Sequence, residues 1–97
     1  MSDWAKDPVV VDLRERISNA DLIILETINR RLELVSRLRE YKQEHGYPFV
    51  DKAREDALVA ELAEVNPGPL STEGLRELYA TLLELMKREA QAQNGRP

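Results

Sequence analysis

The chain has 97 residues, no cysteine and one histidine, and its net charge is −4. These values exclude disulfides and thiolate metal sites, leave no His cluster for zinc, and argue against nucleic acid as a partner. No apolar run reaches the ~18 residues of a membrane span. The first residues lack the apolar core of a signal peptide, so we expect a cytoplasmic protein.

A very long amphipathic helix is predicted from Val9 to His45, after an N-terminal tail over residues 1–8. Asp7 is a favoured N-cap, and Pro8 suits the first helical position. The stretch holds no Gly and no Pro, and its apolar residues recur at helical spacing. We call these residues the apolar stripe: Leu13, Ile17, Ala20, Ile24, Ile28, Val35 and Leu38.

The remainder of the chain is too short to cover this helix. About 37 residues at about 1.5 Å per residue give a length of about 56 Å. A compact domain of this size is only about 35 Å across. The apolar stripe therefore needs a second chain, and symmetric dimers are the commonest assembly. We expect a homodimer in which two long helices lie beside each other.

Two cations interrupt or extend the apolar stripe. Arg31 lies seven residues from Ile24 and seven from Leu38, and Lys42 follows Leu38 by four. Arg31 and Lys42 therefore differ by only about 20° around the helix and lie about 16 Å apart along it. A cation in an apolar seam costs free energy unless an anion meets it. The pattern predicts an anion-binding site.

A short second helix is predicted after the turn that ends the first. Gly46 can adopt the left-handed terminal conformation, and Pro48 prevents continuation. Asp51 is a natural N-cap for a helix over residues 52–64. Its apolar face consists of Leu58, Leu62 and Val65.

A third helix of medium length completes an all-α domain over residues 9–90. The segment Asn66–Pro69 is a firm break, and Ser71 is the expected N-cap. We expect residues 91–97 to form a polar C-terminal tail. The predicted apolar face contains Leu75, Leu78, Tyr79, Leu82 and Met86.

The spacing of the cations suggests that two chains share one site. Arg14 lies 28 residues before Lys42, roughly 42 Å along the helix, which no small ligand spans. If both bind one anion, they come from different chains. Arg31, Arg54 and Glu55 could converge with them. Such a site, with Asp51 also near it, suits a compact dianion that bears a hydroxyl. The alternative is that these charges form solvated faces and surface pairs.

Covalent and metal chemistry find no support in the sequence. No pair of residues makes a convincing nucleophile and base, and no Gly-rich phosphate loop occurs. We expect no metal and no cofactor.

Five matching segments lie within about residues 9–88: Leu13–Ile17, Asn29–Leu32, Tyr41–Lys42, Asp51–Glu55 and the linker Asn66–Leu70. Together they resemble the all-helical (AroQ) class of chorismate mutases. The resemblance implies an intertwined homodimer with two sites. It also implies conversion of chorismate to prephenate by a [3,3] rearrangement, a step of the shikimate pathway towards Phe and Tyr, without a cofactor.

The resemblance also implies roles for the cations. Arg14 of one chain, with Arg31 and Arg54 of the other, would bind the two substrate carboxylates. Lys42 would donate to the ether oxygen as the C–O bond breaks, where partial negative charge develops.

The remaining implied roles concern hydrogen bonds to the substrate. Glu55, helped by Asp51, would hold the ring hydroxyl. Many family members have a Gln or Glu on the third helix as a second donor to the ether oxygen. Counting along the helix leads to Ala90. Glu89 lies one residue earlier and Gln91 one residue later, and Gln91 is our candidate. Met86 stands where the family often has a small hydroxyl residue.

Other functions are compatible with the same scaffold. An isochorismate pyruvate lyase, a 4-amino-4-deoxychorismate mutase and a non-catalytic helical dimer are the alternatives. Glu55 is the discriminating position, because an amine or a moved hydroxyl would need a different partner there. Some relatives are activated by DAHP synthase, the first enzyme of the pathway, which is therefore a candidate partner.

Overall fold

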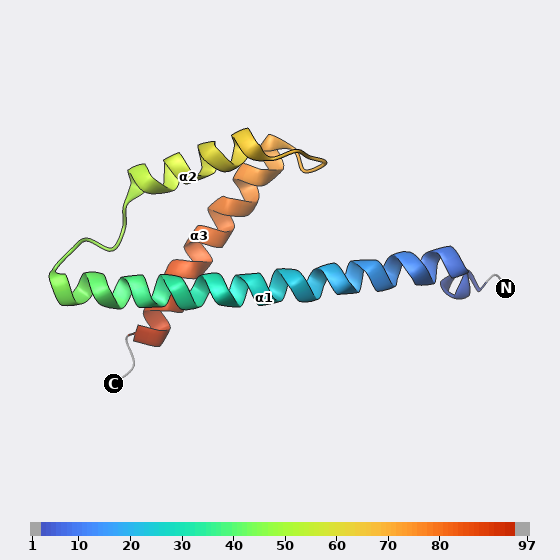
Figure 1. Cartoon of the computed structure of the whole chain (residues 1–97), viewed down its shortest axis with the longest axis horizontal. Coiled ribbons are helices and arrows are strands. Elements are labelled where there is room, and N and C mark those ends of the chain that lie inside the picture. Colours follow the sequence, from blue (N-terminus) through green and yellow to red (C-terminus); the bar gives the residue numbers. More distant parts are fainter. Residues whose placement is uncertain (1–2, 95–97) are drawn as a thin grey trace. The chain divides into compact units, whose positions relative to one another are not determined.

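The computed structural model describes residues 3–94, and every regular element in that range is helical. A short 3-10 helix, η1 (Trp4–Lys6), precedes three α-helices (Figure 1). These are α1 (Pro8–His45), α2 (Lys52–Val65) and α3 (Thr72–Asn94). The prediction of one very long, one short and one medium helix is confirmed. None of the helices in this range is both long and apolar enough to cross a membrane.

The predicted caps set the first residue of each α-helix. Asp7 Oδ1 accepts a hydrogen bond from the Val9 amide at 2.8 Å, so α1 begins at Pro8. The residues before it include η1, so the predicted tail is partly helical. Asp51 Oδ1 accepts from an amide in the first turn of α2, and Ser71 Oγ does the same for α3. Each side chain satisfies a backbone donor that the helix leaves free.

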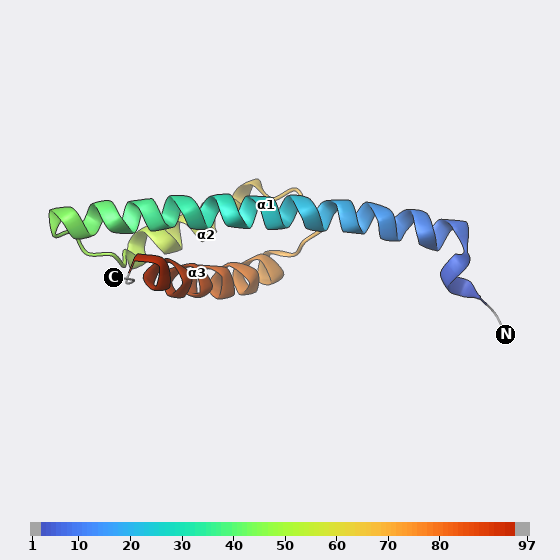
Figure 2. The same cartoon turned by 90° about the horizontal axis from the view of Figure 1, so that it is seen from below.

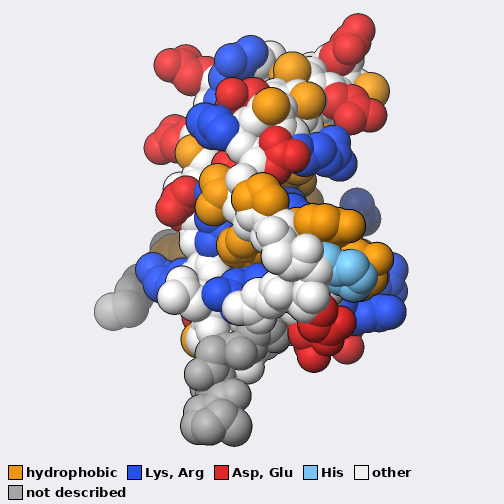
Figure 3. Space-filling model, turned by 90° about the vertical axis from the view of Figure 1, so that its left-hand side faces the viewer, with side chains coloured by type: hydrophobic (Ala, Val, Ile, Leu, Met, Phe, Trp, Pro, Cys, Tyr) orange, Lys and Arg blue, Asp and Glu red, His pale blue; other side chains and the backbone are white. Residues whose placement is uncertain are grey.

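The end of α1 is fixed by a left-handed glycine and an aromatic cluster. Gly46 has a φ of 68°, and the Tyr47 amide donates to the Lys42 carbonyl at 2.9 Å. The ring of His45 stacks on that of Tyr41, with centroids 4.0 Å apart. His45 is the pale blue side chain in Figure 3. The chain thus turns sharply before α2.

The chain divides into two compact units, residues 1–31 and 32–97, and α1 contributes to both. Within the second unit α2 packs against α3. Ser36 Oγ donates to Gln93 Oε1 at 2.7 Å and joins α1 to α3. The C-terminal end of α3 lies beside the part of α1 that belongs to this unit in both views (Figures 1 and 2).

The C-terminal boundary of the helical domain differs from the prediction. We expected a tail over residues 91–97, but α3 continues to Asn94. The hydrogen bond between Ser36 and Gln93 holds this last turn against α1, and such a contact is invisible to local sequence signals. Residues 95–97 lie outside the described range.

The buried apolar core within the described residues is small and belongs to α3. It consists of Leu75, Met86 and Ala90. Leu78, which we expected on this face, is more than half exposed. At about 100° per residue it lies about 60° from Leu75, on the side away from Met86 and Ala90. Val65 of α2 is likewise exposed.

We expect Gly46→Ala to lower the free energy of unfolding by about 1 kcal/mol, because an L residue is strained at a positive φ. An added Cβ meets no atom within 4 Å, so the cost comes from the backbone alone. Gly46→Asn should lose less, since Asn tolerates this conformation. Urea unfolding at one fixed protein concentration measures both variants. Equal stability of the Ala variant and the wild type would contradict the assigned conformation.

Candidate functional site

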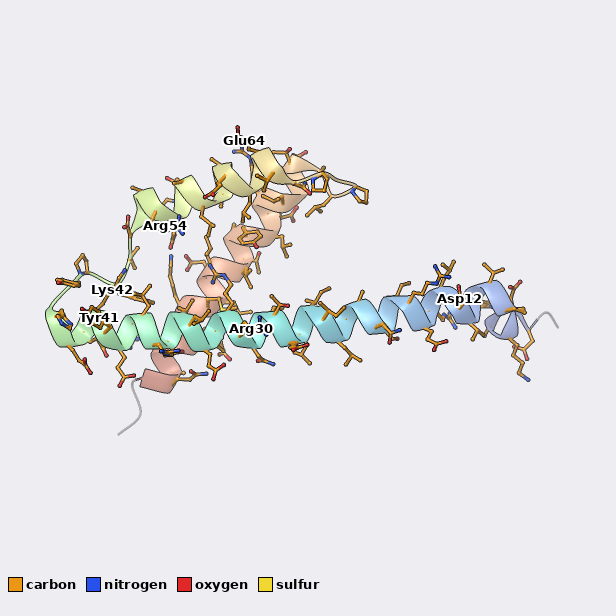
Figure 4. The ribbon with its side chains drawn as sticks, in the orientation of Figure 1. Asp12, Arg30, Tyr41, Lys42, Arg54 and Glu64 are labelled. Carbon is orange, nitrogen blue, oxygen red and sulfur yellow. The ribbon has the colours of Figure 1, made fainter. Side chains whose placement is uncertain are left out.

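Lys42 lies near the end of α1, beside the connection to α2 (Figure 4). The side chain is half-buried, and Nζ donates to the Phe49 carbonyl oxygen at 3.3 Å. Arg39, three residues earlier, holds its guanidinium carbon 5.2 Å from the centroid of the Phe49 ring. Nε and Nη1 of Arg39 are buried and have no hydrogen-bond partner among residues 3–94. The face of an aromatic ring attracts a cation, so the Phe49 ring partly compensates this guanidinium.

The first turn of α2 holds three of the predicted site residues. Asp51 uses Oδ1 to accept from the Arg54 amide at 3.0 Å, and this cap fixes the start of the helix. The side chain of Arg54 is exposed, while Glu55 is half-buried. Glu55 also lies at the positive end of the helix dipole, which favours its negative charge. Lys42 and these residues flank one short connection, and together they offer donors for oxyanions and acceptors for a hydroxyl.

An ion pair between α2 and α3 involves a residue that the sequence prediction missed. Lys87 Nζ lies 2.8 Å from Glu55 Oε2 and 3.1 Å from Glu55 Oε1. It also lies 3.1 Å from Glu84 Oε1. The hydrogen bond to Glu55 raises the pKa of Lys87 above its ordinary value, although burial of the ammonium acts in the opposite direction. Lys87 therefore remains a cation at neutral pH.

The register of α3 separates a buried face from a neighbouring, more exposed face. Met86 and Ala90, to which the family count led, are buried in the core. Lys87 and Gln91 each follow one residue later and are four residues apart, so they are neighbours on one helix face. Gln91 is exposed. This four-residue spacing is the sequence signal that could have identified Lys87.

Two predicted site residues belong to the first unit, residues 1–31. Arg14 is exposed, and its guanidinium carbon lies 4.9 Å from the centroid of the Trp4 ring. Arg31 is half-buried. The second unit contains the other predicted site residues: Lys42, Asp51, Arg54, Glu55 and Gln91.

A hollow of about 450 Å³ lies between α2 and α3. Glu55, Leu83 and Arg76 are among the residues that line it, but Lys42 and Arg54 are not. Within one chain, this hollow therefore contains only some of the predicted site residues of the second unit. Among the described residues, no group of three or more His, Asp or Glu side chains is placed to hold a metal ion.

Comparison with known proteins relates the chain to one enzyme family. The sequence model of the family described as Chorismate mutase type II matches residues 13–91. Form II of the chorismate mutase from Thermus thermophilus is 27% identical, with a TM-score of 0.83 over 87% of this chain and 96% of that one. Form I is 28% identical, with a TM-score of 0.78 over 79% of this chain and 96% of that one. No curated protein sequence matches the chain.

The ion pair of Lys87 predicts how stability depends on pH. Folding raises the pKa of Lys87 above its ordinary value of 10.5. The contribution of the ion pair to the free energy of unfolding is therefore complete below pH 10.5, and it is lost as the pH rises through the pKa of Lys87 in the folded protein. We expect the wild type to exceed Lys87→Met by about 1–2 kcal/mol near neutral pH, and this difference should shrink in strongly alkaline solution.

Urea unfolding over a series of pH values measures this difference. Lys52→Met is the matched control, since Lys52 pairs with Asp56 at 2.9 Å but has a side chain that is 78% exposed. Its loss should change stability little. If the stability difference between the wild type and Lys87→Met stayed constant well above pH 10.5, the assigned ion pair would be contradicted.

Proposed function

Because this chain belongs to the family of type II chorismate mutases, we propose that the side chains described above bind chorismate and assist its rearrangement to prephenate. The chain is an enzyme, an isomerase with the function of a chorismate mutase. The match over residues 13–91 is the observation that carries this conclusion. The lyase and the aminodeoxychorismate mutase are not favoured, because the family and both solved structures are chorismate mutases.

In this proposal the guanidinium groups bind the two carboxylates of the substrate. Arg31 and Arg54 come from one chain, and Arg14 comes from the other. Arg binds carboxylates through two parallel hydrogen bonds, which fixes orientation as well as charge. Holding the flexible enolpyruvyl group over the ring lowers the entropic part of the barrier.

Lys42 is the proposed donor to the ether oxygen. Breaking the C–O bond leaves partial negative charge there, so a placed ammonium stabilises the transition state more than the ground state. Gln91 is the proposed second donor, and its position on the Lys87 face of α3 supports this. Glu55, with Asp51 beside it, is the proposed acceptor for the ring hydroxyl.

The proposed assembly is an intertwined homodimer. Leu13, Ile17 and Ile24 of the apolar stripe are more than half exposed in the single chain, and so is Leu38. A second copy would cover them. The DAHP synthase partner and the cytoplasmic location stay predictions.

We expect Lys42→Ala to lower kcat/KM for chorismate by about 10²–10³-fold, the range for loss of a donor to a developing oxyanion. Circular dichroism should show an unchanged helical content. Lys52→Ala is the control, and its activity should match the wild type, because Lys52 is exposed. A loss of less than about tenfold would remove Lys42 from its assigned role.

The shared site predicts complementation between two inactive variants. Arg14→Ala and Lys42→Ala chains, unfolded and refolded together, form mixed dimers. Each mixed dimer has one site with both native residues and one site with neither. Random pairing should restore about a quarter of wild-type activity. Activity no higher than that of the separate variants, in a sample that is dimeric by mass, would place both residues within one chain.

A further inference from the structure

Lys87 is a mostly buried cation to which neither the sequence prediction nor the proposed function gives a role. Its side chain is 24% exposed, and that of Glu55 is 17% exposed. An ammonium has three N–H donors. Three carboxylate oxygens lie within 3.1 Å of Nζ, two from Glu55 and one from Glu84. The side chain of Glu84 is 78% exposed, so the mostly buried Glu55 is the principal partner of Lys87.

The pairing leaves Glu55 able to accept a further hydrogen bond. An ionised carboxylate has about four lone-pair directions, and Lys87 uses one on each oxygen. A ring hydroxyl is neutral and can donate to one of those that remain. A ring ammonium at the same place would lie within about 5 Å of the Lys87 ammonium, where two like charges repel. The same pair also reduces the negative charge that a dianionic substrate meets.

We propose that Lys87 is a positioning and specificity-determining residue, which aims the Glu55 carboxylate and makes it accept a neutral ring hydroxyl in preference to a ring ammonium. This proposal rests on the proposed function, in which Glu55 holds the substituent of the substrate ring. Lys87 touches Glu55 and not the reacting atoms.

The test compares chorismate with its ring-amino analogue, 4-amino-4-deoxychorismate. For each variant, kcat and KM are measured for chorismate, and the inhibition constant is measured for the analogue. Lys87→Met should lower kcat/KM for chorismate by about tenfold or more, mainly through KM. The preference for chorismate is the ratio of the inhibition constant of the analogue to the KM for chorismate. This ratio should be at least about tenfold lower in Lys87→Met than in the wild type. Lys87→Arg keeps the charge and should keep the wild-type preference.

Two results would overturn the proposal. One is an equal loss of affinity for both ligands in Lys87→Met, which is the effect of a purely structural residue. The other is an unchanged kcat/KM for chorismate in that variant. If instead the wild type does not rearrange chorismate, the proposed function itself has failed, and the two failures remain distinguishable.

A second comparison removes both charges and does not depend on the folding of Lys87→Met. If Lys87 acts only through Glu55, adding Lys87→Met to Glu55→Gln should change kcat/KM by less than about threefold. A further loss of tenfold or more would mean that Lys87 contacts the substrate itself and would overturn the positioning role. Lys6→Met, which breaks the exposed pair with Asp3, is the control and should behave as wild type.

Discussion

The apolar stripe of α1 is the constraint on which the rest of this structure depends. Burying a Leu or Ile contributes about 1.5–3 kcal/mol. Among residues 3–94 the buried apolar side chains all belong to α3, whereas Leu13, Ile17 and Ile24 of α1 are more than half exposed. A long amphipathic helix gains most of its stability by packing this face against another surface. The proposed second copy would provide that surface, and it would also bring a cation of one chain to the proposed site of the other.

Electrostatics determine what such a site can do. A dianion that rearranges without a covalent intermediate needs only binding, orientation and stabilisation of developing charge. In the proposed site, Lys42 and the arginines would supply positive charge for these tasks. The carboxylate of Glu55 would oppose the substrate if it stood alone, but the ammonium of Lys87 lies 2.8 Å from it. The site can therefore keep an acceptor for a hydroxyl without presenting an uncompensated negative charge.

Local signals explain why the helix boundaries were predictable. Asp7, Asp51 and Ser71 each bond an amide within the next few residues, and Gly46 adopts the positive φ that the turn requires. Caps and turns depend on neighbours in sequence, so their chemistry can be read without the fold. The end of α3 could not be predicted in this way, because a contact with Ser36 of α1 holds its last turn.

The sequence by itself determined the three helices, their caps, the exposed stripe and the cations that give the chain its family resemblance. The spacing also placed Met86 on the apolar face of α3, but only the tertiary structure decided that Ala90 is buried there and that Leu78 is exposed. The contact between Lys87 and Glu55, which are 32 residues apart in the chain, is likewise visible only in the tertiary structure. The physical reason is that the rotation of a helix about its axis is set by the surfaces it packs against. Local propensity and spacing therefore predict that a helix forms, but not which neighbour each side chain meets.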